Sequence, residues 1–354
     1  MKIEGVLVDL TKLLTVKALA KQLLRRKETL DAVIWNAGIA GWSGMNWPKA
    51  AWNVTTDLVQ ATTYPTYVIP DVGMTAKHQL QTASQSNGST DVAGAGDEPK
   101  LGQVFLSNVF GHYMLTHWLA PLFTSQSRII WISSISAIPS TFSTDDIQGL
   151  QSHVAYEGSK RLTDLLVLTS ELPSTSPYTS SFLAAEREAQ KPKLIVTHPG
   201  VIATSIVGLH WFVSFFMMAA LYVARFIGSP WHPVTAYKGA ISAAFAALAP
   251  PHQLAELEER EGKGKWGSAA GVFGDERVAR TEVEGWGFGG VVGKVPRGSV
   301  TGTSGQYRGR RETTRDMREQ FEEDGRKVWR EMEELRVEWD KRLGPVSSGE
   351  SEDI

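Results

Sequence analysis

The sequence predicts an α/β protein built on a doubly wound, mostly parallel sheet, and two observations support this class. First, short apolar segments of strand length alternate with longer amphipathic segments along the first two hundred residues. Strands separated by helices form βαβ units, whose strands run parallel. Second, several apolar segments lead directly into turns rich in Asn, Ser, Gly or Pro. With 354 residues, 42% of them hydrophobic, the chain can bury the core that such a fold requires.

The individual elements follow from the period of the apolar residues. Continuous apolar runs bounded by turn residues are typical of buried strands, whereas apolar residues three or four positions apart mark one face of a helix. Val16, Leu19 and Leu23 share such a face. Strands are therefore predicted at 3–10, 30–35, 128–133 and 193–198, and helices at 15–27, 101–123 and about 153–172.

Two segments interrupt the alternation. Residues 81–100 are rich in Ser, Gly, Asn, Asp and Ala, so they offer little to bury and are expected to form a disordered surface insertion. Residues 259–311 combine glycine with charge and are expected to be irregular. We therefore divide the chain into an incomplete sheet domain, 1–250, and a C-terminal extension, 251–354.

The extension contains one clear element, a charged amphipathic helix from about 314 to 343. Thr313 and Asp316 are placed to form a capping box, and Gly344-Pro345 is a stop signal. We favour docking of this helix on its own chain over docking on a partner. Its apolar positions are Met317, Phe321, Val328, Met332, Leu335 and Trp339.

Composition excludes several classes of site and partner. The absence of cysteine excludes disulfides, thiol nucleophiles and Cys-ligated metals. With 36 basic and 38 acidic side chains the net charge is −2, which gives no general attraction to nucleic acid. There is no H-E-x-x-H motif, so no metal is expected, and no G-x-S-x-G elbow, which argues against an α/β-hydrolase. The N-terminal sequence has no apolar core typical of a signal peptide.

The segment 205–228 is the most apolar part of the chain. From 211 to 224 it contains no charge, but a single span of a bilayer needs about 20 such residues. One alternative is a buried core helix. The other, which we favour, is a surface that lies in a membrane or covers an apolar substrate, because Trp211, Phe212, Phe215 and Phe216 crowd its first turns.

A tyrosine and a lysine stand at the centre of the chemistry. Tyr156 and Lys160 are separated by four residues and therefore share one face of the predicted helix. An ammonium beside a phenol favours the phenolate, so we expect Lys160 to lower the pKa of Tyr156 and make it a general acid or base. Taken alone, a pair at this spacing is weak support, since chance produces it about as often as not.

The neighbouring motifs strengthen this interpretation. Ser133 and Ser134 end a predicted strand, at the carboxyl edge where open α/β sheets bind ligands. Asn108 lies in a predicted helix near a glycine that indicates close packing. A further strand leads into His198-Pro-Gly-Val201 and on to Thr204, a turn that could hold a cofactor amide. These elements are expected to converge on one crevice.

In order and context, these residues resemble the Rossmann-like short-chain dehydrogenase/reductase family. The motifs that carry the resemblance are Asn36-Ala37-Gly38, Asn108, the paired serines, Tyr156 with Lys160, and Pro199-Gly200 with Thr204. Within that family the chain is most similar to the 3-ketosteroid reductases of sterol C4-demethylation, including the animal 17β-hydroxysteroid dehydrogenase type 7. The finer likeness rests on NVFGHY at 108–113, YEGSKRLTDLL at 156–166, YPTY at 64–67, KWGS at 265–268 and EVEGW at 282–286.

The resemblance implies roles for these residues. Tyr156 would protonate the C3 ketone oxygen of a sterol, and Ser134, which lies six residues after Arg128, is preferred to Ser133 as the group that holds the carbonyl. Lys160 would bond the nicotinamide ribose, and Asn108 would anchor a water in a proton relay. The cofactor implied is NADPH. Its adenine would lie by Asp9, its adenosine ribose by Asn36, Ala37 and Gly38, and its carboxamide by Pro199, Gly200, Val201 and Thr204.

The sequence departs from the family at the cofactor's pyrophosphate. The glycine fingerprint of the family, T-G-x-x-x-G-x-G, is absent. Gly285–Gly290 matches a G-x-G-x-x-G pattern but lacks a clear preceding strand and a following helix, and the glycines at 38, 41 and 44 have the wrong spacing, with Pro48 interrupting the segment after them. Residues 6–9 correspond to the family's third strand, so we expect the first two strands to be missing, the edge of the fourth to be exposed, and NADPH to bind poorly if at all.

Two functions therefore remain open. The first is an NADPH-dependent reductase of a sterol 3-ketone, at the cytosolic face of the endoplasmic reticulum membrane or on lipid droplets, which works beside other enzymes of sterol C4-demethylation. The second is a non-catalytic member of that assembly, which would hold its partners through the 211–224 segment and the C-terminal helix. Peripheral membrane contact is expected in either case, and nucleic acid is not an expected partner.

Overall fold

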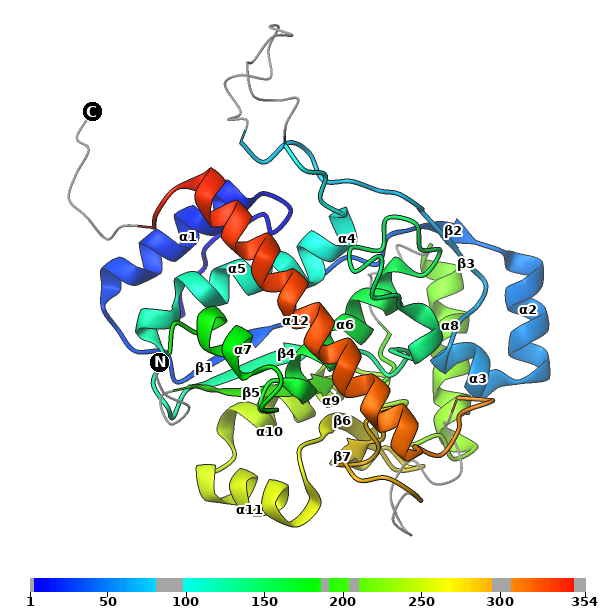
Figure 1. Ribbon diagram of the computed structural model, residues 1–354. Helices are drawn as coiled ribbons and strands as arrows, with labels where there is room; N and C mark the ends of the chain where they lie inside the picture. Colours follow the sequence, from blue (N-terminus) through cyan, green and yellow to red (C-terminus); the bar gives the residue numbers. More distant parts are fainter. Residues whose placement is uncertain (1–2, 81–97, 186–190, 204–209, 295–306, 347–354) are drawn as a thin grey trace, which may run out of the picture.

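A five-stranded, mostly parallel sheet organises the molecule (Figure 1). The computed structural model describes residues 3–80, 98–185, 191–203, 210–294 and 307–346. The strand order is β1-β4-β5-β6-β7, in which the first four strands run parallel and β7 is antiparallel to β6. The strands are β1 Ala32–Trp35, β4 Arg128–Ile132, β5 Lys193–His198, β6 Lys265–Ala270 and β7 Glu276–Thr281. The predicted α/β class is confirmed.

Helices cover both faces of the sheet. On one face lie α5, Gly111–Trp118, and α6, Ala155–Thr169, and against α5 packs α1, Leu13–Arg26. On the other face lies α10, Ile241–Leu248, with α11, Pro251–Glu261, beside it (Figure 1). Four shorter or peripheral helices are α4 Gln103–Phe105, which leads into the π-helical turn Leu106–Phe110, α7 Ser176–Phe182, α8 Trp211–Phe226 and α9 Ala236–Gly239. Short 3₁₀ turns occur at Ala120–Leu122 and Pro139–Thr141.

The predicted strand at 3–10 is wrong, because this segment forms no strand. Among the described residues β1 is the edge of the sheet, and no strand pairs with residues 3–10. A strand needs a neighbour to satisfy its backbone hydrogen bonds. Only the end of the segment joins the core, where Leu10 packs over Gly111. Leu7 is fully exposed, and Ile34 in β1 is partly exposed. Among the described strands, none pairs with the outer edge of β1.

The expectation of irregular structure at 259–311 is also wrong, since β6 and β7 lie in this range and complete the sheet. Every residue of β6 is buried although its sequence, KWGSAA, contains few large apolar side chains. Gly267 is required there, because a Cβ would lie 2.4 Å from the Nε2 atom of His198. β6 and β7, which follow residue 250, therefore belong to the same sheet as β1, β4 and β5.

A small unit between β1 and α4 was not predicted. It consists of a two-stranded antiparallel sheet, β2 and β3, with two helices between its strands. Pro48 does not interrupt the chain here, because it occupies the first turn of a helix that Asn46 caps. The bounds are β2 Trp42–Met45, α2 Trp47–Thr56, α3 Leu58–Thr63 and β3 Val68–Pro70.

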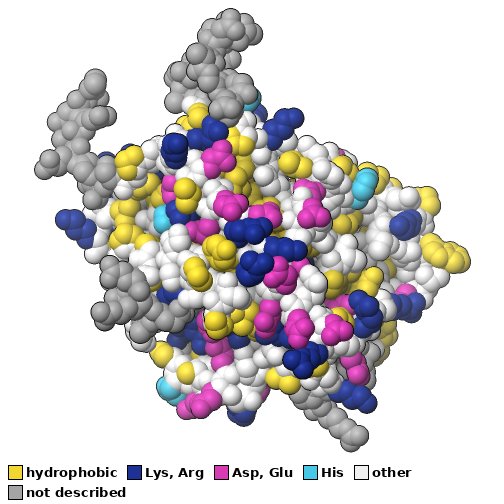
Figure 2. Space-filling view, in the orientation of Figure 1, with side chains coloured by type: hydrophobic (Ala, Val, Ile, Leu, Met, Phe, Trp, Pro, Cys, Tyr) yellow, Lys and Arg dark blue, Asp and Glu magenta, His cyan; other side chains and the backbone are white. Residues whose placement is uncertain are grey.

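The C-terminal helix, α12, spans Arg315–Leu343 and docks on its own chain, as favoured. Its N-cap is Thr314, which accepts a hydrogen bond from the Met317 backbone N–H, so the predicted cap at Thr313 is wrong by one residue. The helix crosses α6 and packs against α7 (Figure 1). Figure 2 shows basic and acidic side chains interspersed over the outward side. Buried apolar residues of α12 are Phe321, Val328, Trp329, Met332 and Trp339.

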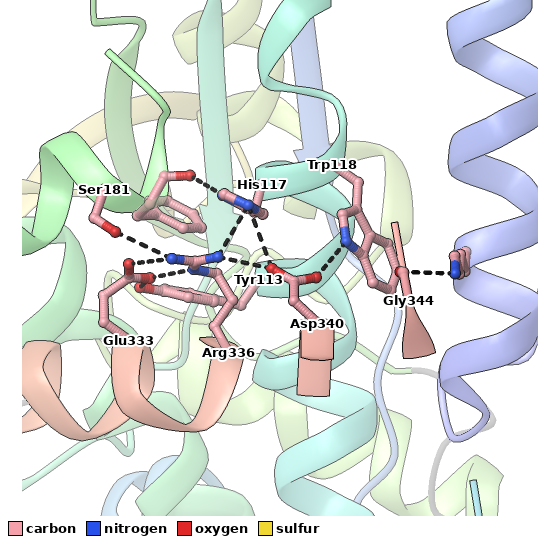
Figure 3. A network of polar contacts seen from close by, with 10 residues as sticks. Tyr113, His117, Trp118, Ser181, Glu333, Arg336, Asp340 and Gly344 are labelled. Atoms are coloured by element: carbon pink, nitrogen blue, oxygen red, sulfur yellow. Dashed lines mark hydrogen bonds and ion pairs between the residues drawn. The ribbon is translucent and has the colours of Figure 1, made fainter. Parts of the chain in front are cut away.

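A network of polar contacts locks α12 onto α5 and α7 (Figure 3). Arg336 donates to Glu333 at 2.8 Å, to Asp340 at 2.7 Å and to the Ser181 hydroxyl at 3.0 Å. Glu333 in turn accepts a hydrogen bond from the Tyr113 hydroxyl at 2.7 Å. Arg336 and Glu333 are both buried, so each charge depends on the other.

Replacing Arg336 should destabilise the protein strongly. Arg336→Met leaves the Glu333 carboxylate buried without its cation, so we expect a loss of about 3–5 kcal/mol in the free energy of unfolding, measured by urea denaturation. Arg330→Met is the matched control, because Arg330 pairs with Glu334 on the exposed side of the same helix. That change should cost less than about 1 kcal/mol. Equal losses in the two variants would contradict this explanation of how α12 is held.

Candidate active site

A cavity of about 550 Å³ opens at the carboxyl ends of β1, β4 and β5, a size typical of small-molecule sites. The residues after these three strands form its floor, and α6 forms one wall. This is the edge at which open α/β sheets bind ligands. Predicted residues that line the cavity are Asn36, Ala37, Gly38, Ser133, Ser134, Tyr156, Lys160, Pro199, Gly200 and Val201.

The loop after β1 is held in place by Asn108. The Asn108 side chain accepts a hydrogen bond from the Ile39 backbone N–H at 2.8 Å and donates to the Ile39 carbonyl at 3.0 Å. It also donates to the Ser159 hydroxyl at 3.1 Å. A side chain at Gly38 would displace Asn108, since a Cβ would lie 2.7 Å from the Asn108 Oδ1 atom. Asn108 therefore lies beside the cavity without lining it, and the water expected on it stays a prediction.

The two serines at the end of β4 face in different directions. Ser133 is buried and donates its hydroxyl to the Lys160 carbonyl at 3.1 Å, so it joins the strand to α6. The Ser134 hydroxyl lies 2.9 Å from the Ser136 hydroxyl, and Ser134 lines the cavity together with Tyr156. The preference for Ser134 as the group that could hold a ligand carbonyl agrees with this geometry.

Tyr156 lies in the first turn of α6 with its ring edge-on to Trp42, at 5.8 Å between ring centroids. Burial raises the pKa of its phenol to about 12, and the charge of Glu157 adds to that shift, whereas the bond with Ser134 opposes it. The predicted net lowering of the Tyr156 pKa is therefore wrong, because burial is the largest effect on this phenol. The phenol is protonated at neutral pH, which is the state that a general acid needs.

Lys160 follows one turn later on the same face of α6. Its ammonium donates to the Ile132 carbonyl at 2.8 Å and lies 5.6 Å from the centroid of the Tyr156 ring. Burial, followed by the charge of Lys265, lowers the pKa of Lys160 to about 8, and Asp164 opposes the shift. The charge of Lys160 therefore changes only about one pH unit above neutrality.

The turn after β5 depends on glycine. Gly200 has φ +69°, and a Cβ there would lie 2.8 Å from the carbonyl oxygens of Ser268 and Trp231. Beside it, the Val201 backbone N–H donates to the Trp231 carbonyl at 2.7 Å. These bonds fix the backbone of Pro199, Gly200 and Val201 along the cavity. Thr204, predicted to reach the same ligand, lies outside the described residues.

Asp9 is not brought to the cavity. Its carboxylate accepts hydrogen bonds from the backbone and the hydroxyl of Thr11, at 2.9 and 2.6 Å. Because residues 3–10 form no strand, Asp9 does not occupy the strand-end position on which its predicted role depends. Its proposed contact with an adenine has no support in this geometry.

The wall opposite α6 is apolar and comes from the small β2/β3 sheet, which was not predicted, and from the apolar segment that forms α8. Trp42, Met45 and Val68 belong to the small β2/β3 sheet, and Met217 and Leu221 belong to α8. The predicted aromatic residues Trp211, Phe212, Phe215 and Phe216 do not line the cavity but are exposed on the outer side of α8. The alternative of a buried core helix is therefore excluded for this segment. A period of three to four residues, Met217 to Leu221, is the signal that could have identified the inner face.

The described lining fits one half of a dinucleotide. The strand-end loops, Lys160 and the positive-φ turn at Gly200 offer polar groups and close backbone approach for a nicotinamide and its ribose. The lining includes no glycine-rich turn that leads from a strand into a helix, the feature that binds a pyrophosphate. Gly44 lies within β2, and Gly285 packs against Phe321 of α12, so neither glycine pattern supplies it.

The protein is similar to several fungal steroid reductases. It is 41% identical to the 3-keto-steroid reductase of Aspergillus fumigatus, over 95% of this chain and 77% of that protein. It is 38% identical to the 3-keto-steroid reductase of Gibberella zeae, over 89% and 68% of the two chains. With the enzyme of that name from Kluyveromyces lactis the identity is 33%, over 78% and 70%. The chain matches no protein-family model.

Substitution of Gly200 should disrupt the turn beside the cavity. Gly200→Ala places a Cβ on a backbone with positive φ and within 2.8 Å of two carbonyl oxygens, so we expect a loss of at least about 2 kcal/mol in the free energy of unfolding. The control is Gly5→Ala, because a Cβ at Gly5 would contact nothing within 4 Å. Urea denaturation of both variants measures the difference. A Gly200→Ala variant as stable as the control would contradict the strained turn.

Proposed function

Because the chain belongs to the family of the fungal 3-keto-steroid reductases, we propose that it reduces the C3 ketone of a sterol intermediate to the 3β-alcohol with NADPH. The reaction would serve sterol C4-demethylation on the way to ergosterol. The observation that carries the proposal is the cavity itself, where Ser134, Tyr156 and Lys160 meet at a strand end opposite an apolar wall. A polar end and an apolar wall match a ligand that is a hydrocarbon with one ketone.

Tyr156 acts as the proton donor in this proposal. Its phenol is protonated at neutral pH, and both Tyr156 and Ser134 line the cavity, so the two groups can meet one ketone oxygen. The Ser134 hydroxyl donates a hydrogen bond to that oxygen and polarises the carbonyl. As the oxygen gains charge, the phenol gives up its proton to it, and the product is an alcohol. The Lys160 ammonium stabilises the phenolate that remains on Tyr156.

A nicotinamide cofactor supplies the hydride when it is bound. We assign Pro199, Gly200, Val201 and Thr204 to its carboxamide, Lys160 to its ribose, and Asn36, Ala37 and Gly38 to the adenosine ribose. The choice of NADPH rests on the family resemblance, and the expectation of weak NADPH binding stays a prediction. Assays of the chain therefore require NADPH at millimolar concentration.

We also propose that the protein contacts a membrane through α8, at the endoplasmic reticulum or a lipid droplet. The outer side of this helix exposes Trp211, Phe212, Phe215 and Phe216, while its inner side lines the cavity through Met217 and Leu221. A helix that is apolar on both sides could pass an apolar substrate from a lipid phase to the site. Among the described helices, none is long and apolar enough to cross a bilayer.

A second candidate is the non-catalytic member of a sterol-demethylation assembly. The absence of a pyrophosphate-binding turn from the described lining favours it. The apolar side of α12 is buried against α6 and α7, so it cannot hold partner proteins as this candidate function assumed. In that case α8 would make the contacts with other demethylation enzymes. Complete lack of ketone reduction at millimolar NADPH would favour this candidate.

Loss of the Tyr156 hydroxyl should abolish turnover. Tyr156→Phe removes the proton donor, so we expect kcat for reduction of cholestan-3-one in detergent to fall about 100- to 10,000-fold. Tyr237→Phe is the matched control, because Tyr237 is exposed and does not line the cavity. Ser134→Ala should also reduce kcat, since it removes the group that holds the ketone oxygen. Undiminished turnover in Tyr156→Phe would show that another group donates the proton.

Ketone reduction should weaken in alkaline solution. The pKa of Lys160 is about 8, so its ammonium is charged below that pH and neutral above it. Only the charged form stabilises a Tyr156 phenolate, and kcat/KM should therefore fall as the pH rises above about 8. A pH–rate profile measures this. A profile that stays level up to pH 10 would contradict the role given to Lys160.

Binding to lipid should depend on the outer side of α8. The triple change Phe212→Ser, Phe215→Ser and Phe216→Ser removes apolar area that would enter the interface, so sedimentation with phosphatidylcholine vesicles should weaken at least about tenfold. A triple control, Phe273→Ser, Val291→Ser and Val337→Ser, removes equally exposed apolar residues elsewhere. Equal weakening in both variants would refute a membrane contact through α8.

A further inference from the structure

A second buried lysine, Lys265, lies behind the reactive serine. Its ammonium donates to the Ser134 carbonyl at 2.6 Å and to the Asp164 carboxylate at 2.7 Å. The two side chains are only 2% and 0% exposed. Lys265 comes from β6 and Asp164 from α6, so the contact joins the sheet to the helix that carries Tyr156. Lys265 does not line the cavity, so any effect on the reaction must pass through another residue.

Stability alone is a poor explanation for this ion pair. Removing two charges from water costs about as much as their attraction returns, and apolar residues of similar size are often as stable. One Asp164 oxygen, Oδ1, has no hydrogen-bond partner among the described residues, so Lys265 is the main partner of this carboxylate. We therefore look for a role of this pair in positioning the neighbouring Ser134 backbone or in setting the charge around Lys160.

The backbone at the end of β4 shows what the pair holds. The last ladder bond of the strand is the donation from the Ser133 N–H to the Thr197 carbonyl, at 2.7 Å. Beyond it the chain leaves the sheet, and the Ser134 carbonyl receives only a long bond of 3.4 Å from the Ala137 N–H besides that of Lys265. Lys160 holds the Ile132 carbonyl in the same way, two residues earlier. Two lysines thus replace the missing strand partners.

We propose that Lys265, held by Asp164, is a positioning residue of the reductase site that fixes the Ser134 backbone and so directs the Ser134 hydroxyl at the ketone oxygen. The inference rests on the proposed function, because it assigns Ser134 to the ketone. Misplacement of a reacting group by about 1 Å can reduce a rate about 100-fold. Loss of Lys265 should therefore reduce kcat rather than substrate binding.

Lys265 also sets the charge around Lys160. The groups that face the two lysines are Asp164, Arg161 and Tyr156 on α6, His112 on α5 and His198 on β5. Burial lowers the pKa of both histidines, so these are neutral at pH 7. The charge of Lys265 lowers the pKa of Lys160 more than Asp164 raises it. Removing both charges should raise the pKa of Lys160.

The test uses the double variant Lys265→Met with Asp164→Leu, which removes both charges of the pair together. The buried Arg161 keeps the charges of Glu284 and Asp324 as partners, and urea denaturation checks that the variant is folded. We expect kcat for cholestan-3-one at millimolar NADPH to fall about 10- to 100-fold, with KM changed less than about threefold. In a Ser134→Ala background the same change should alter kcat less than about twofold, since its effect passes through Ser134. Nitrogen NMR titration of the lysine Nζ atoms, assigned with Lys160→Met, should show a raised pKa for Lys160.

The matched control is Arg336→Met with Glu333→Leu, which removes a buried ion pair that does not border the cavity. It should leave kcat and the pKa of Lys160 unchanged. An unchanged kcat in the Lys265 variant, or an equal loss in the Ser134→Ala background, would overturn the positioning role while the proposed function stands. Absence of ketone reduction in the unaltered protein would instead overturn the proposed function and this role with it.

Discussion

The packing of α6 across the end of β4 is the constraint on which the site depends. Three contacts fix it: Lys160 donates to the Ile132 carbonyl, Ser133 donates to the Lys160 carbonyl, and Gly158 leaves room for the Thr141 carbonyl, 2.9 Å from where a Cβ would lie. Because these contacts set the height and rotation of the helix, they also place Tyr156 beside Ser134.

Helix α12 supports α6 from the opposite side. Gly325 lets the two helices approach closely, since a Cβ there would lie 2.5 Å from the Thr169 side chain, and Trp329 donates its indole N–H to the Leu166 carbonyl at 3.0 Å. The buried charges of Arg336 and Glu333 then fix the position of α12 along α5 and α7. This pair contributes to the stability of the fold, and neither residue lines the cavity.

Much of this arrangement could be predicted from sequence because it is local. Apolar runs gave β1, β4 and β5, and the four-residue spacing placed Tyr156 and Lys160 on one face of α6. Features that depend on residues far apart in the chain could not be predicted. Residues 3–10 have the pattern of a strand, but a strand exists only where a partner pairs with it. In β6 the small residues that permit burial look like loop sequence, and Lys265 meets a carboxylate far away in the chain. The direction of the Tyr156 pKa shift also depends on burial, which spacing does not reveal.

A protonated phenol, a hydroxyl and an apolar wall come together in one reductase site, and the central claim is transfer of hydride to a sterol C3. The most direct measurement is product analysis by mass spectrometry after incubation of cholestan-3-one with the protein and millimolar NADPH that carries deuterium at the transferable position of the nicotinamide. We expect an alcohol with one deuterium, located at C3. Unchanged ketone, or an alcohol without deuterium, would contradict the claim.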